Sequence, residues 1–125
     1  MSNNGTGGSR RVLIVEDDVM IRMLVEDMLT DLGYTVTAQA ARVDEALKAA
    51  QRADIDVAIL DLNLNGHATF PVAELLAARG TPFIFATGYG EHGLPDAFRD
   101  RPLLKKPFQI DGLKRMLDAA LASKT

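Results

Sequence analysis

The chain contains no cysteine among its 125 residues. It therefore has no disulfide framework, no thiolate metal site and no cysteine nucleophile. No apolar run reaches the length that crosses a bilayer, and the N-terminus lacks the charged-then-apolar pattern of a signal peptide. The net charge of −3, with 25% charged residues, gives no basic footprint for nucleic acid or a membrane surface. We therefore expect a cytoplasmic protein that binds neither nucleic acid nor membrane.

The length fits one domain with one real core. Residues 1–9, "MSNNGTGGS", are rich in glycine, serine and asparagine and predict a flexible tail. Residues 10–125 are then the single folded domain, and they contain no internal repeat.

Apolar runs alternate with segments of helical period along this domain. The predicted strands are 11–16, 34–40, 56–61, 82–87 and 101–106. A first helix begins at the N-cap Asp18 and stops at Gly33, and its methionines, like Met116 of the last helix, are expected to be core or near-core residues. Two more helices follow the second and third strands, the third closing at Gly80, and a last one carries Ile110 to Leu121. The span "GYGEHGLPDAFRD" is a poor helix former, so a fourth helix is expected to be weak or partly disordered.

This alternation predicts an α/β fold, a doubly wound five-stranded parallel sheet in the order 2-1-3-4-5. Ligands in such folds bind beyond the carboxyl ends of the strands, where the strand order reverses. The polar residues at those ends are Glu16, Asp17 and Asp18, then Asp61, Thr87, Lys105 and Lys106. Asp17 and Asp61 should face each other at the reversal.

In the stretch "LIVEDD", a predicted buried strand is followed directly by three consecutive carboxylates. Two carboxylates about 4 Å apart repel by roughly 4 kcal/mol at an effective dielectric near 20, so something must offset the cost. A helix N-terminus or solvent would do so, and Asp18 reads as such a cap. A hard cation such as Mg²⁺ would also do so, because it prefers oxygen ligands. A carboxylate can also act as a nucleophile and form an aspartyl phosphate, with a lysine and a hydroxyl neutralising the phosphoryl oxygens.

The ordered motifs "VEDD", "LDLN", "FATG" and "KKPF" resemble the receiver domain of bacterial two-component response regulators, over about residues 10–122. The resemblance implies a flavodoxin-like receiver fold and phosphoryl transfer from a phosphohistidine of a sensor histidine kinase, or of a phosphotransfer protein, to Asp61. It implies that Asp17 binds Mg²⁺ directly, Glu16 through water and Asn63 through its main-chain carbonyl. Thr87 and Lys106 would contact the phosphoryl group. Asp61 would complete the metal ligands.

Two positions depart from the family pattern. Leu103 stands where receivers usually carry a rotating aromatic residue, and Asn65 stands where many have proline. The phrase "FATGYG" is similar to a subgroup of single-domain receivers with a Phe-Ala-Thr-Gly motif, whose partners are often kinases of the HWE type. For this chain we expect phosphorylation to order residues 88–100 and reposition Tyr89.

The expected function is a stand-alone response regulator that switches protein contacts or relays phosphate to an unknown downstream protein. It would catalyse its own phosphorylation and dephosphorylation without being a turnover enzyme. One alternative is a Mg²⁺-dependent aspartyl-phosphate phosphohydrolase, which commonly needs a second aspartate where Asn63 stands. Another is flavin or nucleotide binding, which needs a glycine- or hydroxyl-rich loop after the first strand.

Overall fold

A five-stranded parallel sheet forms the centre of the molecule in the computed structural model, which describes residues 10–52, 54–87, 103–105 and 109–122. Its strand order is β2-β1-β3-β6-β7. The strands are β1 (Arg11–Val15), β2 (Thr35–Ala40), β3 (Val57–Asp61), β6 (Phe83–Thr87) and β7 (Leu103–Lys105). All neighbouring pairs are parallel. The predicted fold class and strand order are confirmed.

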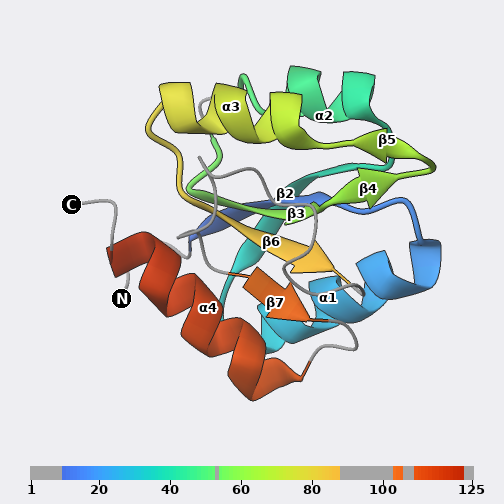
Figure 1. Ribbon diagram of the computed structural model, residues 1–125. Coiled ribbons are helices and arrows are strands. Elements are labelled where there is room, and N and C mark those ends of the chain that lie inside the picture. Colours follow the sequence, from blue (N-terminus) through green and yellow to red (C-terminus); the bar gives the residue numbers. More distant parts are fainter. Residues whose placement is uncertain (1–9, 53, 88–102, 106–108, 123–125) are drawn as a thin grey trace.

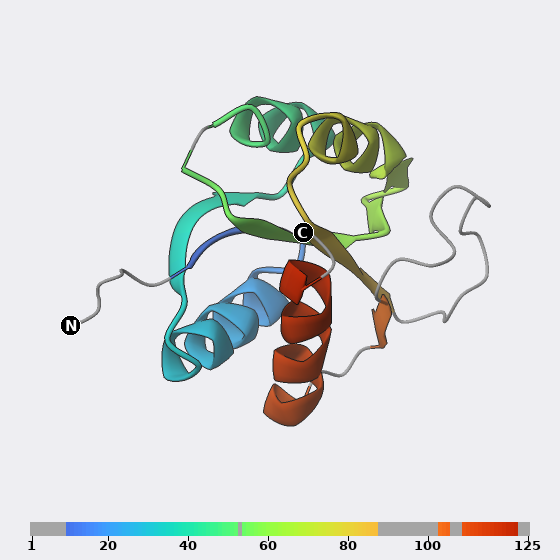
Figure 2. The ribbon, with the colours of Figure 1, turned by 90° about the vertical axis from the view of Figure 1, so that its left-hand side faces the viewer.

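Helices cover both faces of this sheet. The helices are α1 (Val19–Asp31), α2 (Val43–Ala49), α3 (Phe70–Ala78) and α4 (Ile110–Ala122). Helices α2 and α3 lie on one face, and α1 and α4 lie on the other, as the two views show (Figures 1 and 2). Among the described residues, no helix is long and apolar enough to span a bilayer.

Each face of the sheet has its own core. Leu13 and Val15 of β1 pack toward α2 and α3, whereas Val12 and Ile14 pack toward α1 and α4. Side chains alternate along a strand, so a strand covered on both faces must be apolar at every position. This explains why "VLIV" and "VAIL" read as unbroken apolar runs.

Helix α1 begins and ends where the sequence predicts. The Asp18 carboxylate accepts the backbone N–H groups of Met20 and Ile21 at 2.9 and 3.2 Å, a standard N-cap. At the other end Gly33 has φ +90°, a conformation that glycine adopts without strain.

The prediction that the methionines of this helix lie in or near the core is wrong for two of them. Met20 is 75% exposed and Met23 is 57% exposed. The buried positions of α1 are Val25 and Leu29. Because an α-helix turns about 100° per residue, Met20 and Met23 lie on the side away from this buried stripe. Met28 packs against the core as expected.

A hairpin that the sequence analysis did not anticipate follows β3. Strands β4 (Asn63–Leu64) and β5 (His67–Ala68) pair antiparallel. Asn65 (φ +52°) and Gly66 (φ +91°) connect them. Two successive residues with positive φ form a type I′ turn, for which Asn-Gly is the favoured pair.

Several predictions fall outside the described residues. These are the flexible tail at 1–9, the weak fourth helix and Tyr89 within 88–102, and Lys106.

Candidate functional site: an acidic cluster at the carboxyl edge of the sheet

Three carboxylates meet where β1 and β3 end. β1 stops at Val15, so Glu16 and Asp17 follow directly, and Asp61 is the last residue of β3. Because β1 and β3 are neighbours in register, their carboxyl ends reach the same edge, on the right in Figure 1. One oxygen from each of Glu16, Asp17 and Asp61 lies within 4.8 Å of the other two. This edge is also where the strand order reverses.

The cluster differs in burial from one carboxylate to the next. Glu16 and Asp61 are buried, at 4% and 8% exposed, and Asp17 is half-buried. Burying like charges beside each other is costly unless hydrogen bonds or a cation compensate.

Backbone N–H groups supply part of that compensation. Each carboxylate accepts one of them on one oxygen: Asp18 N–H to Glu16 Oε2 at 3.1 Å, Asn63 N–H to Asp61 Oδ1 at 3.3 Å, and Asn65 N–H to Asp17 Oδ2 at 3.0 Å. Hydrogen bonds to ionised acceptors are about twice as strong as neutral ones.

The β4–β5 hairpin holds two of these donors in place. The Asn63 side chain accepts the N–H of Gly66 at 2.8 Å and closes the turn. Behind it, the fully buried Thr69 donates its hydroxyl to the main-chain carbonyl of Asp61 at 2.6 Å. The hairpin is thus tied at both ends to the strand that carries Asp61. Sequence analysis missed this support, although Asn65-Gly66 is a recognised hairpin signal.

Arg22 approaches the cluster from α1. Its Nη1 donates to the main-chain carbonyl of Glu16 at 2.9 Å. The guanidinium brings a positive charge close to the acidic side chains without occupying their oxygens.

The remaining predicted site residues are placed only in part. Asn63 lies in β4 and is exposed. Ala86 of β6 pairs with Asp61, so the backbone of Thr87 ends one residue further along the same edge. Lys105 ends β7 and pairs with Thr87. The side chain of Thr87 and all of Lys106 lie outside the described part of the chain.

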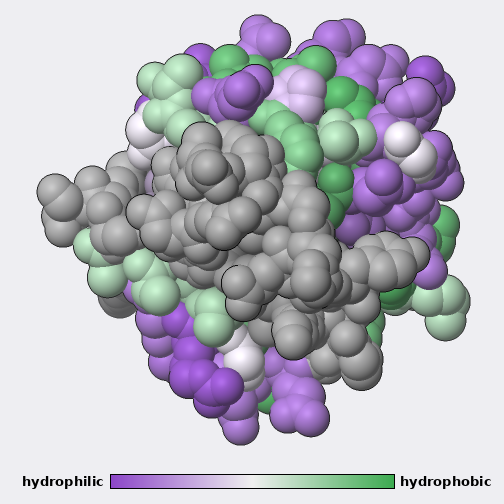
Figure 3. Space-filling model, in the orientation of Figure 1, coloured by the Kyte–Doolittle hydropathy of each residue, from purple (hydrophilic) through white to green (hydrophobic). Residues whose placement is uncertain are grey.

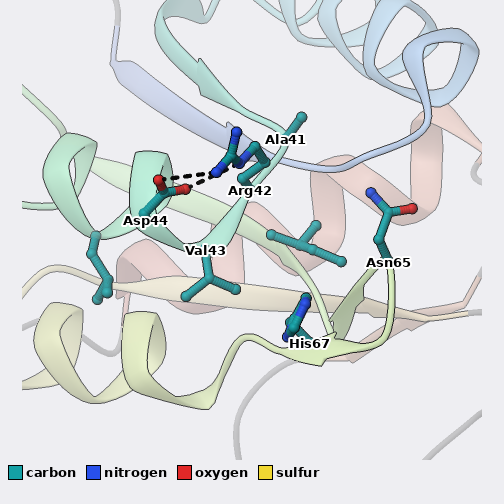
Figure 4. A pocket seen from close by; sticks show the side chains of 8 residues that line it. Ala41, Arg42, Val43, Asp44, Asn65 and His67 are labelled. Atoms are coloured by element: carbon teal, nitrogen blue, oxygen red, sulfur yellow. Dashed lines mark hydrogen bonds and ion pairs between the residues drawn. The ribbon is translucent and has the colours of Figure 1, made fainter.

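A cavity of about 520 Å³ lies beside the hairpin, against the start of α2. Its lining residues are Ala41, Arg42, Val43, Asp44, Leu47, Leu64, Asn65 and His67. Figure 4 shows Asn65 and His67 on one side of this cavity and Arg42 and Asp44 on the other. Arg42 and Asp44 form an ion pair with each other at 3.3 Å. Asn65 therefore borders the cavity with its side chain while its N–H holds Asp17.

Exposed apolar side chains gather on α1, the helix that starts next to the cluster. Four apolar residues in the first half of α1 are each at least 44% exposed, and we call them the exposed face of α1: Val19, Met20, Met23 and Leu24. Apolar surface is visible at the lower right of Figure 3, over the position of α1 in Figure 1. An apolar patch of this kind beside a polar site is typical of a protein contact surface.

At the opposite edge of the sheet, Arg11 and Asp56 form an ion pair at 3.0 Å. The Arg11 guanidinium and its backbone N–H both donate to this carboxylate. These bonds hold the pKa of Asp56 below its ordinary value, chiefly through the side-chain hydrogen bond.

The donor set of the cluster fits a hard divalent cation. Glu16, Asp17 and Asp61 offer oxygen ligands only, and they lie close enough to share one ion. Mg²⁺ suits such a site because it binds a few carboxylates and keeps water or phosphate oxygens in its other positions. It would also neutralise the repulsion that the backbone donors only reduce.

Comparison with known proteins agrees with this geometry. The model of the response regulator receiver domain matches residues 12–118. The transcriptional regulatory protein PdtaR of Mycobacterium tuberculosis is 31% identical over 117 residues, which cover 90% of this chain and 57% of PdtaR. The chain thus spans little more than half the length of that relative.

Two solved structures of a protein named SdrG are similar as well. The solution structure from Sphingomonas melonis Fr1 is 46% identical, with a TM-score of 0.82, and the match covers 90% of this chain and 97% of SdrG. The BeF3-activated conformation of SdrG from Pseudomonas melonis Fr1 is 45% identical, with a TM-score of 0.79 and coverage of 92% and 98%.

Proposed function

The chain belongs to the response regulator receiver family, and we propose on that basis that Asp61 accepts a phosphoryl group from a phosphohistidine of a partner protein. The observation that carries the proposal is the position of Asp61, buried at the end of β3 with oxygens of Glu16 and Asp17 within 4.8 Å. Of the three carboxylates, Asp61 is the one whose main chain is fixed by a buried hydroxyl.

The reaction is a nucleophilic displacement at phosphorus. An Asp61 carboxylate oxygen forms the new O–P bond, the P–N bond of the phosphohistidine breaks, and the departing imidazole keeps the electron pair and takes up a proton. Asp17, Asp61, Glu16 through water, and the main-chain carbonyl of Asn63 would hold Mg²⁺. The ion, when bound, would neutralise charge on the phosphoryl oxygens. Thr87 and Lys106 would bind those oxygens from the ends of β6 and β7.

The partner would reach Asp61 across the exposed face of α1. That face begins directly after the Asp18 cap, so a protein resting on Met20 and Met23 would bring its histidine to the carboxyl edge of the sheet. The donor would be a sensor histidine kinase, of the HWE type that the Phe-Ala-Thr-Gly resemblance implies, or a phosphotransfer protein. The protein would work in the cytoplasm as a phosphorylation switch or a phosphate relay, without turnover of a small substrate.

The hydrolase alternative gains no support from the hairpin. Such enzymes commonly carry an acid/base aspartate two residues after the nucleophile, and Asn63 carries an amide there. Its Oδ1 accepts the Gly66 N–H and closes the turn. The amide therefore has a structural role.

The test is phosphorylation of the wild type and Asp61→Asn by candidate kinases with ATP and Mg²⁺. The wild type should gain acid-stable, base-labile phosphate, and Asp61→Asn should gain none while keeping its far-UV circular dichroism. Asp56→Asn is the matched control, because this aspartate lies at the opposite edge of the sheet. Equal labelling of Asp61→Asn and the wild type would refute the proposal.

A further inference from the structure

Thr69 stands at the start of helix α3, but its hydroxyl does not cap that helix. It is the N-cap residue of α3, and its side chain makes no cap hydrogen bond. An N-cap hydroxyl usually accepts the N–H of the second or third helical residue. Here the second is Pro71, which has no N–H, and the third, Val72, donates to the main-chain carbonyl of Thr69 at 3.0 Å. The helix therefore does not require the hydroxyl.

The hydroxyl bonds the strand that carries the proposed phosphoacceptor instead. Thr69 is fully buried, where an unpaired hydroxyl would be costly, and it donates to the main-chain carbonyl of Asp61 at 2.6 Å. The pairing of β3 with β1 ends at Leu60, one residue before Asp61. Thr69 thus bonds the chain at the point where β3 loses one of its two neighbouring strands.

The peptide groups that follow Asp61 take two hydrogen bonds from Thr69. The hydroxyl bonds the Asp61 carbonyl, and the N–H of Thr69 donates to the Leu62 carbonyl at 3.2 Å. The peptide group between Leu62 and Asn63 also carries the N–H that donates to the Asp61 carboxylate at 3.3 Å. Thr69 therefore orients both the backbone from which the Asp61 side chain extends and the donor that this side chain accepts.

Helix α3 makes Thr69 a fixed donor. Val72, Ala73 and Leu76 are fully buried in the core on this face of the sheet. The N–H groups of Val72 and Ala73 bond the Thr69 carbonyl at 3.0 and 3.1 Å. A side chain supported by packing and hydrogen bonds in this way holds a reacting group in place without reorganising during the reaction.

We propose that Thr69 is a positioning residue for phosphoryl transfer, which holds the Asp61 carboxylate in the orientation that attacks phosphorus. The proposal rests on the proposed function, since Asp61 is the nucleophile of that reaction. Thr69 does not contact the reacting atoms, and it acts through the main chain of Asp61 and Asn63. A displacement of about 1 Å can slow a reaction about 100-fold, so we expect the loss of one restraint among several to slow it about tenfold.

The test is phosphorylation of the full chain by acetyl phosphate in excess Mg²⁺, because this small donor needs no partner surface. Thr69→Val keeps the shape of the side chain but lacks the hydroxyl, and it should lower the rate constant about tenfold. Thr69→Ser keeps the hydroxyl and should keep the wild-type rate. Ala77→Gly is the matched control, because it weakens the far end of the same helix through helix propensity and should leave the rate unchanged.

A second measurement reports on the position of Asp61 without phosphorylation. Hydrogen exchange of the Asn63 amide, which is bonded to the Asp61 carboxylate, should be about tenfold faster in Thr69→Val. It should be unchanged in Thr69→Ser and in Ala77→Gly. A residue that only stabilised α3 would not distinguish these variants.

The outcomes separate this inference from the function beneath it. The inference is overturned if Thr69→Val keeps the wild-type rate of phosphorylation or of Asn63 amide exchange, or if Thr69→Ser or Ala77→Gly is slowed as much as Thr69→Val. If the wild type takes up no phosphate, or if Asp61→Asn is labelled equally, the proposed function fails, and the inference fails with it even where the amide exchange is as expected.

Discussion

Replacing Asp17 by asparagine should stabilise the metal-free protein and destabilise it relative to wild type once Mg²⁺ is present. The substitution removes one of three negative charges whose oxygens lie within 4.8 Å of one another. At that separation each pair repels by about 3.5 kcal/mol at an effective dielectric near 20 and by about 0.9 kcal/mol in bulk water. Because Asp17 is half-buried, we take the lower figure, so losing two pairs gains about 2 kcal/mol.

A hydrogen bond works against this gain. Asparagine can still accept the Asn65 N–H through its amide oxygen, but a neutral acceptor is weaker than a charged one by about 1 kcal/mol. The net stabilisation is therefore about 1 kcal/mol, or about 4 °C in melting temperature for a chain of this length. With Mg²⁺ at 100 times its dissociation constant, the wild type gains about 2.7 kcal/mol that the variant largely lacks, so the order of stability reverses.

The assay is urea unfolding in EDTA and in Mg²⁺, at two salt concentrations. The gain in EDTA should persist at 0.1 M salt, where the Debye length is about 10 Å, and shrink at 1 M, where it is about 3 Å. Asp18→Asn is the matched control, because this neighbouring carboxylate caps α1 and lies outside the cluster. If Asp17→Asn is the less stable protein in EDTA at low salt, or if Mg²⁺ stabilises both proteins equally, the reasoning is wrong.

Three further substitutions test other parts of the structure. Asp56→Asn should cost about 1 kcal/mol at pH 7, since Arg11 is partly exposed. The lowered pKa of Asp56 means that the wild-type advantage is complete above the ordinary value of 3.8 and disappears as pH falls through the folded-state pKa, so urea unfolding at pH 7 and pH 3 should show the two proteins converging. Thr69→Val removes the hydroxyl bonded to the Asp61 carbonyl, so it should lower the free energy of unfolding by about 1 kcal/mol in the same assay and slow phosphorylation. Thr69→Ser keeps the hydroxyl and should do neither. Equal effects of the two substitutions would show that the hydroxyl does not support Asp61. Met23→Gln should leave stability within about 0.5 kcal/mol but slow phosphoryl transfer from the partner kinase, with Met23→Leu as the apolar control, and unchanged transfer would exclude this face as the contact.

The architecture was predictable because β1 and β3 each contain an unbroken apolar run, at residues 12–15 and 57–60. Such runs are typical of strands that are covered on both faces of a parallel sheet. Parallel topology then placed Asp17 and Asp61 at one edge of the sheet, and the structure brings them together. The roles of Thr87 and Lys106 stay predictions from resemblance.

Two features could not be derived from periodicity. The helical repeat of α1 does not include Met20 and Met23, and both were expected at or near the core only because methionine generally fills gaps in cores, whereas the structure exposes them. The hydrogen bond from the Asn65 N–H to the Asp17 carboxylate depends on the positive φ of Asn65 within a two-residue turn. The Asn-Gly pair signals that turn, but the partner of its N–H lies 48 residues away.

The exposed methionines on α1 give the proposed partner surface a sensitivity to oxidants. Oxidation converts an apolar thioether into a polar sulfoxide, and exposed side chains react most readily. At 75% and 57% exposure, Met20 and Met23 can oxidise without disturbing the packing of Val25 and Leu29. A preparation aged in air would therefore keep its melting temperature and its Mg²⁺ affinity while losing phosphoryl transfer from the kinase. Treatment with methionine sulfoxide reductase would restore that transfer.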